Sequence, residues 1–207
     1  MNSDPKGPGA EHARAARRGP EPPGRAELEA VRSRDPAALA SFFQRYSSHV
    51  YSLVYRLLGA REEAEDVTQD VFFKVHRAAH RLDPDRDPLP WLTAIAYNTC
   101  RDVWRSGSHR LDRRSDSLED DAGLADRLPG PADDPETERI RIERETAVQE
   151  ALLRLPEAMR AAIVLHDYEG LSHQEVAVLT RVGHAAARKR YSRALAALAK
   201  LLEETVT

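Results

Sequence analysis

Residues 170–194, GLSHQEVAVLTRVGHAAARKRYSRA, are typical of two helices joined by a short turn. Ser172 and Glu175 stand three positions apart, a spacing at which each side chain can cap the other residue's backbone amide at a helix start. Gly170 is suited to end a preceding helix, because glycine readily adopts a positive φ. The stretch therefore predicts a helix-turn-helix, an arrangement that many DNA-binding modules use.

The second predicted helix has an apolar face and a basic face. Six lysines or arginines and no acidic residue lie between positions 181 and 200. Apolar residues recur at spacings of four, three, four and three, at Ala187, Tyr191, Ala194, Leu198 and Leu201. The opposite face, which we expect to meet phosphates and base edges, carries Ala185, Arg188, Lys189, Ser192 and Arg193. The alternative is a basic helix face that contacts only water.

The composition narrows the class of protein. The chain of 207 residues has room for one large domain or two small ones, and its lack of a long apolar run predicts no membrane insertion. Residues 1–25 are rich in Pro, Gly and Arg without the apolar centre of a signal peptide, so we expect a disordered tail and a cytoplasmic protein. Cys100 is the single cysteine, which excludes a disulfide framework and a zinc-cysteine cluster.

Charge is distributed unevenly along the chain. Residues 112–138 hold ten acidic residues and three arginines, a net charge of −7, so the chain's total of −3 leaves +4 for the remainder. The same stretch contains three prolines and no apolar periodicity. We therefore expect residues 108–142 to form a flexible acidic linker between two small helical domains, an all-α architecture.

Three helices are predicted in the domain at residues 26–107. Asp35 followed by Pro36 is a typical cap and first turn, and this helix should end at Gly59. The next helix begins near residue 61, and the last runs from residue 88 or 90 to about 106. The helix that begins near residue 61 has an apolar stripe, which implies that one of its faces is buried. Its other face carries Asp66, Gln69 and Asp70.

The last of these helices carries a mixed stripe at helical spacing. Aromatic, amide and guanidinium groups of this kind stack on unpaired bases and follow their phosphates. The stripe consists of Trp91, Ala94, Asn98, Arg101 and Arg105. The alternative is that Trp91 belongs to the core and the arginines face water.

Other function classes fit less well. His76 and His80 have the spacing of a zinc site on a helix, but the intervening Arg77 is not the glutamate that a zinc protease needs. No nucleophile motif or glycine-rich phosphate loop occurs, so we expect no catalysis, metal or cofactor. A two-module regulator that only binds DNA would explain the basic helix, but it would leave the Asp66, Gln69 and Asp70 cluster and the stripe at residues 91–105 without a purpose.

Three stretches, in this order, resemble a known family. They are similar to the clamp-docking helix, the promoter-melting helix and the minus-thirty-five reader of a bacterial RNA polymerase sigma factor, of the extracytoplasmic-function (ECF) type in the sigma-70 family. The stretches are AEDVTQDVFFKV (64–75), LPWLTAIAYNTCRDVWR (89–105) and LLRLPEAMRAAIVLHDYEGLSHQEVA (152–177). The resemblance implies sigma region 2 at residues 26–107 and sigma region 4 at residues 143–207.

The resemblance also implies a function and partners. The protein would bind core RNA polymerase, through its β′ clamp and β subunits, and direct promoter-specific initiation; an anti-sigma factor is a further implied partner. The implied clamp contacts are Asp66, Gln69, Asp70, Phe73 and Lys74. The implied minus-ten contacts are Trp91, Asn98, Arg101 and Arg105, with Asn98 holding a flipped base. The minus-thirty-five contacts would be Ala185, Arg188, Lys189, Ser192 and Arg193. The acidic linker would lie in the basic polymerase cleft or act as a solvated tether.

The turn of the helix-turn-helix departs from the family pattern. Arg181 stands where the family usually has a glycine, and a glycine follows two residues later at Gly183. Ala185 and Ala186 replace the usual glycine and threonine at the start of the recognition helix. The turn is therefore the least typical part of the chain.

Overall fold

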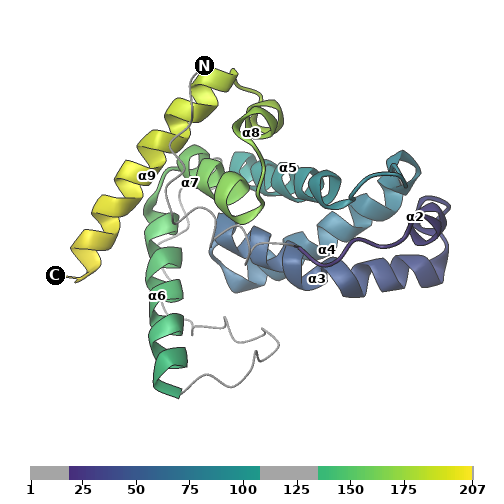
Figure 1. The fold of residues 1–207 in the computed structure, drawn as a ribbon, viewed down its shortest axis with the longest axis horizontal. Coiled ribbons are helices and arrows are strands. Elements are labelled where there is room, and N and C mark those ends of the chain that lie inside the picture. Colours follow the sequence, from purple (N-terminus) through teal and green to yellow (C-terminus); the bar gives the residue numbers. More distant parts are fainter. Residues whose placement is uncertain (1–18, 108–134, 207) are drawn as a thin grey trace.

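The computed structural model describes residues 19–107 and 135–206, and every regular element in these ranges is helical (Figure 1). The N-terminal module contains α2 (Arg25–Arg32), α3 (Pro36–Leu58), α4 (Arg61–Ala78), the 3₁₀ turn η1 (Ala79–Arg81) and α5 (Leu89–Gly107). The C-terminal module contains α6 (Pro135–Arg154), α7 (Glu157–Ile163), the π-helical turn η2 (Val164–Tyr168), α8 (His173–Thr180) and α9 (His184–Val206). The predicted all-α, two-module fold is confirmed. Within the described ranges, no helix has the length and apolar character needed to cross a membrane.

Helix α3 is the centre of the N-terminal module. Its predicted ends are confirmed: Asp35 accepts a hydrogen bond from the Ala38 amide at 2.8 Å, and Gly59 closes the helix with a φ of 89°. One face of α3 buries Phe42, Tyr46, Val50, Leu53, Val54 and Leu57. Helices α4 and α5 pack on this face with their own apolar stripes, and α2 crosses one end.

Helix α5 begins at Leu89, where Asp87 accepts a hydrogen bond from the Leu89 amide at 2.9 Å. Its inner face buries Leu92, Ala96 and Cys100. Burial raises the pKa of the Cys100 thiol to about 12, so this thiol is a core group rather than a reactive one.

The prediction of a disordered tail at residues 1–25 is wrong for its last seven residues, and residues 1–18 lie outside the described residues. Residues 19–25 were assigned to it, but they are described, and α2 already begins at Arg25. The Arg45 guanidinium donates to the Glu21 carbonyl at 3.1 Å, and Pro23 is buried. The backbone therefore lies against the module despite its composition.

The predicted linker also ends earlier. Residues 135–142 were assigned to it, but they form the first turns of α6. Ion pairs at helical spacing support this segment: Arg139 contacts Glu136 and Glu143, and Arg141 contacts Glu145 at 3.0 Å. These ion pairs stabilise the first turns of α6, where the sequence has no apolar stripe. The rest of the linker, residues 108–134, lies outside the described residues.

The predicted helix-turn-helix is confirmed. Ser172 and Glu175 form a complete capping box at the start of α8, and Gly170 has a φ of 70° after η2. Ala187 and Ala194 of α9 are buried, and the remaining stripe residues Tyr191, Leu198 and Leu201 pack against the C-terminal core. Helices α6 and α7 supply the other side of this core.

The two modules share one apolar core. Val164, Leu165, Leu171 and Val176 of the C-terminal module belong to the same buried cluster as the inner residues of α3, α4 and α5. Arg160 of α7 is 8% exposed, and its guanidinium donates to the backbone carbonyls of Leu57, Leu153 and Leu155. Burial lowers the pKa of this guanidinium. The described modules are thus packed together rather than held only by the chain between them.

The atypical turn has a simple conformational signature. Arg181 caps the end of α8 in the left-handed conformation, with a φ of 60°, whereas Gly183 has no positive φ. A residue with a Cβ is strained there, and glycine is not. The departure from the family pattern therefore costs stability at the position where glycine would be favoured.

Arg181→Gly should raise the free energy of unfolding by about 0.5–1 kcal/mol, because it removes the Cβ from a left-handed cap. Urea unfolding of the full chain measures this change. Gly183→Ala is the control, since no atom lies within 4 Å of the added Cβ and φ is not positive there. A loss of stability in Arg181→Gly would contradict the assignment of strain.

Arg160→Met should lower the free energy of unfolding by roughly 2–4 kcal/mol, because three backbone carbonyls lose a buried donor. Arg154→Met is the matched control: its side chain is 54% exposed and pairs with Glu204, so its loss should cost less than about 1 kcal/mol. Equal effects of the two substitutions would show that the buried contacts of Arg160 contribute no more than a surface pair.

Candidate protein and nucleic-acid interfaces

Helix α4 presents a polar surface opposite its buried stripe. All five residues of the predicted clamp surface are exposed: Asp66, Gln69, Asp70, Phe73 and Lys74. Phe73 is 68% exposed among these polar groups. Lys74 donates to the Thr99 hydroxyl at 3.1 Å and lies 3.8 Å from Asp102, which holds its ammonium beside α5. Acidic groups around an accessible aromatic ring suit a protein partner with basic and apolar groups.

The stripe on α5 is only partly accessible. Trp91 packs against the shared core and remains half-buried, so part of its surface is accessible. Asn98 is half-buried and its side-chain amide donates to the Ala94 carbonyl at 2.7 Å. Arg101 is half-buried, whereas Arg105 at the end of the helix is exposed. Helix α5 thus carries both this stripe and residues that pack in the core.

The C-terminal module lies close to this stripe. Tyr97 of α5 is 6% exposed, and burial raises the pKa of its phenol against the opposing charges of Arg101 and Arg190. Arg190 belongs to α9, so the recognition helix reaches the neighbourhood of α5.

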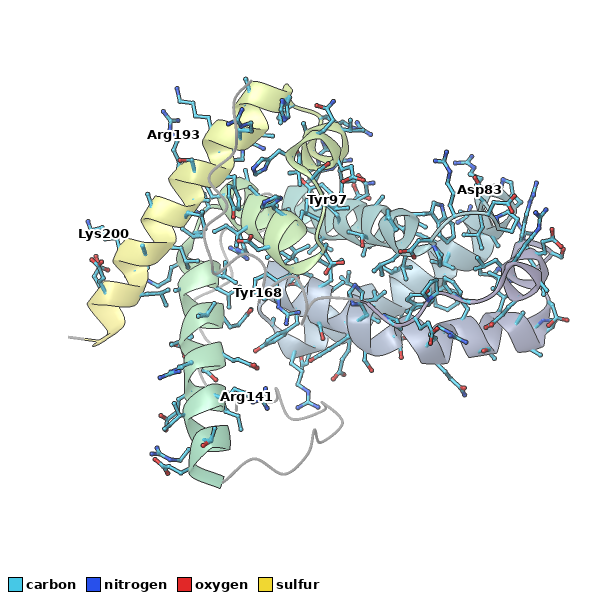
Figure 2. The ribbon with its side chains drawn as sticks, in the orientation of Figure 1. Asp83, Tyr97, Arg141, Tyr168, Arg193 and Lys200 are labelled. Carbon is cyan, nitrogen blue, oxygen red and sulfur yellow. The ribbon has the colours of Figure 1, made fainter. Side chains whose placement is uncertain are left out.

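Helix α9 exposes its basic face. Ala185, Arg188, Lys189, Ser192 and Arg193 are all exposed, on the side opposite the buried stripe. Figure 2 shows Arg193 pointing away from the molecule. The predicted minus-thirty-five surface is therefore accessible as a set.

A cluster of rings fixes the helix-turn-helix behind this face. The imidazoles of His166 and His173 are stacked with centroids 4.1 Å apart, and Tyr191 packs edge-on against His166. The Tyr191 hydroxyl donates to Asp167 at 2.9 Å. The cluster joins η2, α8 and α9, so the orientation of the basic face is set by packing.

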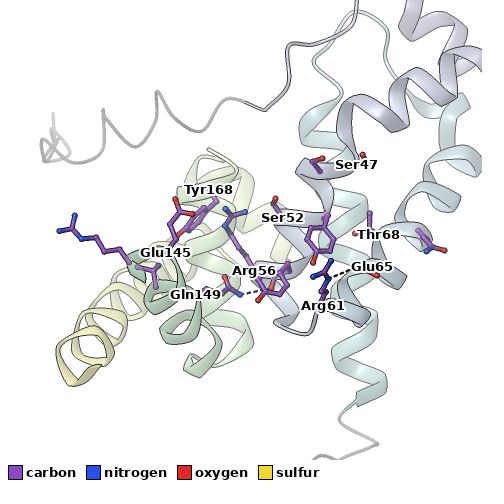
Figure 3. Close-up of a pocket in the computed structure, with 15 residues that line it drawn as sticks. Ser47, Ser52, Arg56, Arg61, Glu65, Thr68, Glu145, Gln149 and Tyr168 are labelled. Carbon is purple, nitrogen blue, oxygen red and sulfur yellow. Dashed lines mark hydrogen bonds and ion pairs between the residues drawn. The ribbon is translucent and has the colours of Figure 1, made fainter. Parts of the chain in front are cut away.

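A cleft of about 630 Å³ lies between the modules (Figure 3). Helices α3 and α4 form one wall, with Tyr51, Tyr55 and Gln69, and α6 and η2 form the other. Arg56 lies over the Tyr168 ring at 4.5 Å from its centroid. Because its walls come from both modules, the cleft exists only in this relative arrangement.

The residues that join the modules were not predicted from the sequence. Glu169 accepts hydrogen bonds at one carboxylate oxygen from His49 at 2.9 Å and from Thr93 at 3.0 Å, and its side chain is 2% exposed. Gln149 donates to the Tyr55 carbonyl at 3.1 Å. Each of these residues resembles a surface residue in its local pattern, so no periodicity could have identified them.

A metal centre finds no support in the described residues. They contain no group of three or more His, Cys, Asp and Glu that could hold a metal ion. His76 and His80, which have the helical spacing of a zinc pair, are exposed.

The chain matches known proteins over both modules. Residues 42–110 match the model of Sigma-70 region 2, and residues 145–198 match that of Sigma-70, region 4. It is 30% identical to RNA polymerase sigma-H factor of Pseudomonas aeruginosa, over 85% of this chain and 92% of that protein. It is 32% identical to ECF RNA polymerase sigma factor SigM of Mycobacterium tuberculosis, over 81% of this chain and 79% of that protein.

The fold also matches a solved structure, the sigma factor RpoE in complex with the anti-sigma factor NepR from Bartonella quintana. The TM-score is 0.59 at 21% identity, over 79% of this chain and 96% of that one. The two region matches, in the predicted order, and the relatives that they accompany lead to one conclusion: this chain belongs to the sigma-70 family of RNA polymerase sigma factors, in its ECF type.

Proposed function

We propose that the three surfaces divide the work of a sigma factor among them, with α4 binding core RNA polymerase, α5 acting on the minus-ten element and α9 reading the minus-thirty-five element. As an ECF sigma factor, the chain directs promoter-specific transcription initiation. One observation supports this assignment of roles to α4, α5 and α9. The polar residues proposed to make the contacts lie on the outer faces of these helices, whose inner faces form the core. Runoff transcription with core polymerase on a promoter that carries both elements tests the function as a whole.

The clamp contact would use charge and one aromatic ring. Asp66 and Asp70 supply carboxylates to basic groups of the β′ clamp, and Gln69 supplies an amide. Phe73, with 68% of its surface exposed, would be buried on binding and contribute an apolar anchor. Lys74 would fix the edge of the patch beside α5.

The minus-ten contact would use the stripe on α5. Asn98 would exchange its intrahelical bond to Ala94 for a base edge, since an amide can donate and accept there. Trp91 would stack on an unpaired base, and Arg101 and Arg105 would follow phosphates. Unstacking costs a few kcal/mol, and a pocket that recovers this cost makes melting depend on sequence.

The minus-thirty-five contact would use the exposed face of α9. Arg188, Lys189, Ser192 and Arg193 can reach phosphates and base edges in the major groove. Ala186 near the start of α9 stands where the family usually has a threonine, so the phosphate bond that a hydroxyl would make is absent at this residue. We infer that base-edge contacts by arginine carry more of the specificity here, at about 1–3 kcal/mol for a good bidentate pair.

The remaining expectations are proposals of the same kind. We assign region 2 to residues 26–107 and region 4 to residues 143–207, with an acidic linker between them. Sigma factors as a family are not catalytic, and we propose that this chain acts in the cytoplasm without a catalytic site or cofactor. An anti-sigma factor is a further proposed partner, since the RpoE structure with a similar fold contains one.

Asp70→Lys should weaken binding to core polymerase at least tenfold, because it reverses a charge at the centre of the proposed clamp surface. Fluorescence anisotropy of the labelled chain with core polymerase measures the affinity. Glu150→Lys, an equal charge reversal at an exposed position of α6, is the control and should leave affinity within twofold. Unchanged affinity in Asp70→Lys, with circular dichroism like the wild type, would refute the clamp assignment.

Asn98→Ala should slow open-complex formation about tenfold or more on a duplex promoter, and much less on a template already unpaired at the minus-ten element. The difference arises because the amide is proposed to hold a base that melting releases. Ser106→Ala, which removes an exposed polar group from the same helix, is the control. Equal losses on the two templates would argue against a role in melting.

A further inference from the structure

Helix α5 carries one acidic residue among its nineteen, and this residue lies beside the proposed minus-ten stripe. Asp102 directly follows Arg101 and stands four positions after Asn98, a spacing that places it one turn along nearly the same face of the helix. Its side chain is 60% exposed. A carboxylate at this position repels the phosphates that Arg101 and Arg105 are proposed to follow.

Lys74 of α4 reaches this carboxylate across the contact between the two helices. Its ammonium lies 3.8 Å from Asp102 Oδ2 and donates to the Thr99 hydroxyl at 3.1 Å. Thr99 is 3% exposed, and its hydroxyl donates in turn to the Ile95 carbonyl at 2.8 Å. The acceptor that Lys74 uses is therefore fixed by the helix itself. Two contacts on successive parts of α5 hold the ammonium next to Asp102.

The pair changes the charge beside the stripe more than it changes the stability of the module. The side chains of Lys74 and Asp102 are 46% and 60% exposed, and water screens an ion pair at such a site. DNA phosphates, however, respond to every charge within about 8 Å at physiological salt. With Lys74 present the pair is neutral. Without Lys74, α5 presents the carboxylate to DNA without the ammonium that neutralises it.

The geometry of Lys74 differs from that of its neighbour on the clamp surface. Phe73 is 68% exposed, whereas the Lys74 ammonium is held by two groups of another helix. The proposed partner of Asp66 and Asp70 carries basic groups, and such groups would repel an ammonium. Lys74 therefore lies at the edge of the clamp surface with its charge directed to α5.

We propose that Lys74 is a positioning residue for the minus-ten contact, which holds Asp102 against α4 and neutralises it so that unpaired DNA can approach Asn98 and the arginines of α5. The inference rests on the minus-ten role proposed for α5. Removal of Lys74 then harms DNA binding through Asp102, and the harm disappears when the carboxylate is removed as well. A direct contact between Lys74 and a phosphate would instead be lost to the same extent with or without Asp102.

The test is a double-mutant cycle on DNA binding by the holoenzyme. Core polymerase saturated with the full chain binds a fluorescent promoter fork, which is double-stranded through the minus-thirty-five element and unpaired across the minus-ten element. Lys74→Met keeps the length of the side chain and removes the charge, and it should weaken fork binding at least threefold. In the Asp102→Asn background the same substitution should change the affinity by less than about 1.5-fold. Arg77→Met, which removes an exposed cation from the same helix, is the control and should leave fork affinity unchanged.

Three results would overturn the assignment of Lys74. Equal losses in the two backgrounds would indicate a direct phosphate contact, and no loss in either background would leave the pair without a role in DNA binding. Core affinity of Lys74→Met should stay within twofold of the wild type, and a loss like that of Asp70→Lys would place Lys74 on the clamp instead. Open-complex formation by Asn98→Ala on duplex DNA does not involve Lys74, so a failure of the minus-ten role is distinguishable from a failure of this assignment.

Discussion

The rest of the structure depends on how the end of helix α3 is satisfied. A helix leaves its last carbonyls without partners inside the helix, and here Arg160 of the C-terminal module donates to the Leu57 carbonyl. Gln149 adds a second hydrogen bond to the Tyr55 carbonyl, which also accepts from the Gly59 amide at 2.9 Å. Arg160 simultaneously holds the carbonyls of Leu153 and Leu155 at the junction of α6 and α7. One buried guanidinium therefore ties the end of the first module to the corner of the second. The positive charge is also favourable at the negative end of a helix.

The positions of the functional surfaces follow from this arrangement. Helices α4 and α9 each bury one face and expose the other, so their polar residues can change without repacking the core. Helix α5 is different because Thr93 and Tyr97 are buried while Asn98 and Arg101 on neighbouring turns are half-buried. Helix α5 therefore contributes both to the packing of the core and to the proposed DNA surface.

Local chemistry explains which elements were predictable. The caps at Asp35 and Ser172 and the glycines at positions 59 and 170 act over a few residues, so the ends of α3 and α8 followed from sequence. The start of α6 at Pro135 lies inside the predicted linker, because ion pairs rather than an apolar stripe support its first turns. The clamp and recognition surfaces were predictable as faces, because an amphipathic period places them opposite the core. Their contacts with polymerase and DNA stay predictions.

The sequence by itself determined α3, α4, α5, α8 and α9, the two modules and their outward faces, because periodicity and capping are short-range properties of the chain. Only the tertiary structure decided that Glu169, His49 and Thr93 meet, although 120 and 76 positions separate the glutamate from its partners. It also decided that Arg160 is buried, since an arginine in a short helix has no local signal for burial. Hydrogen bonds between distant segments depend on how modules dock, and docking is set by the fit of whole surfaces.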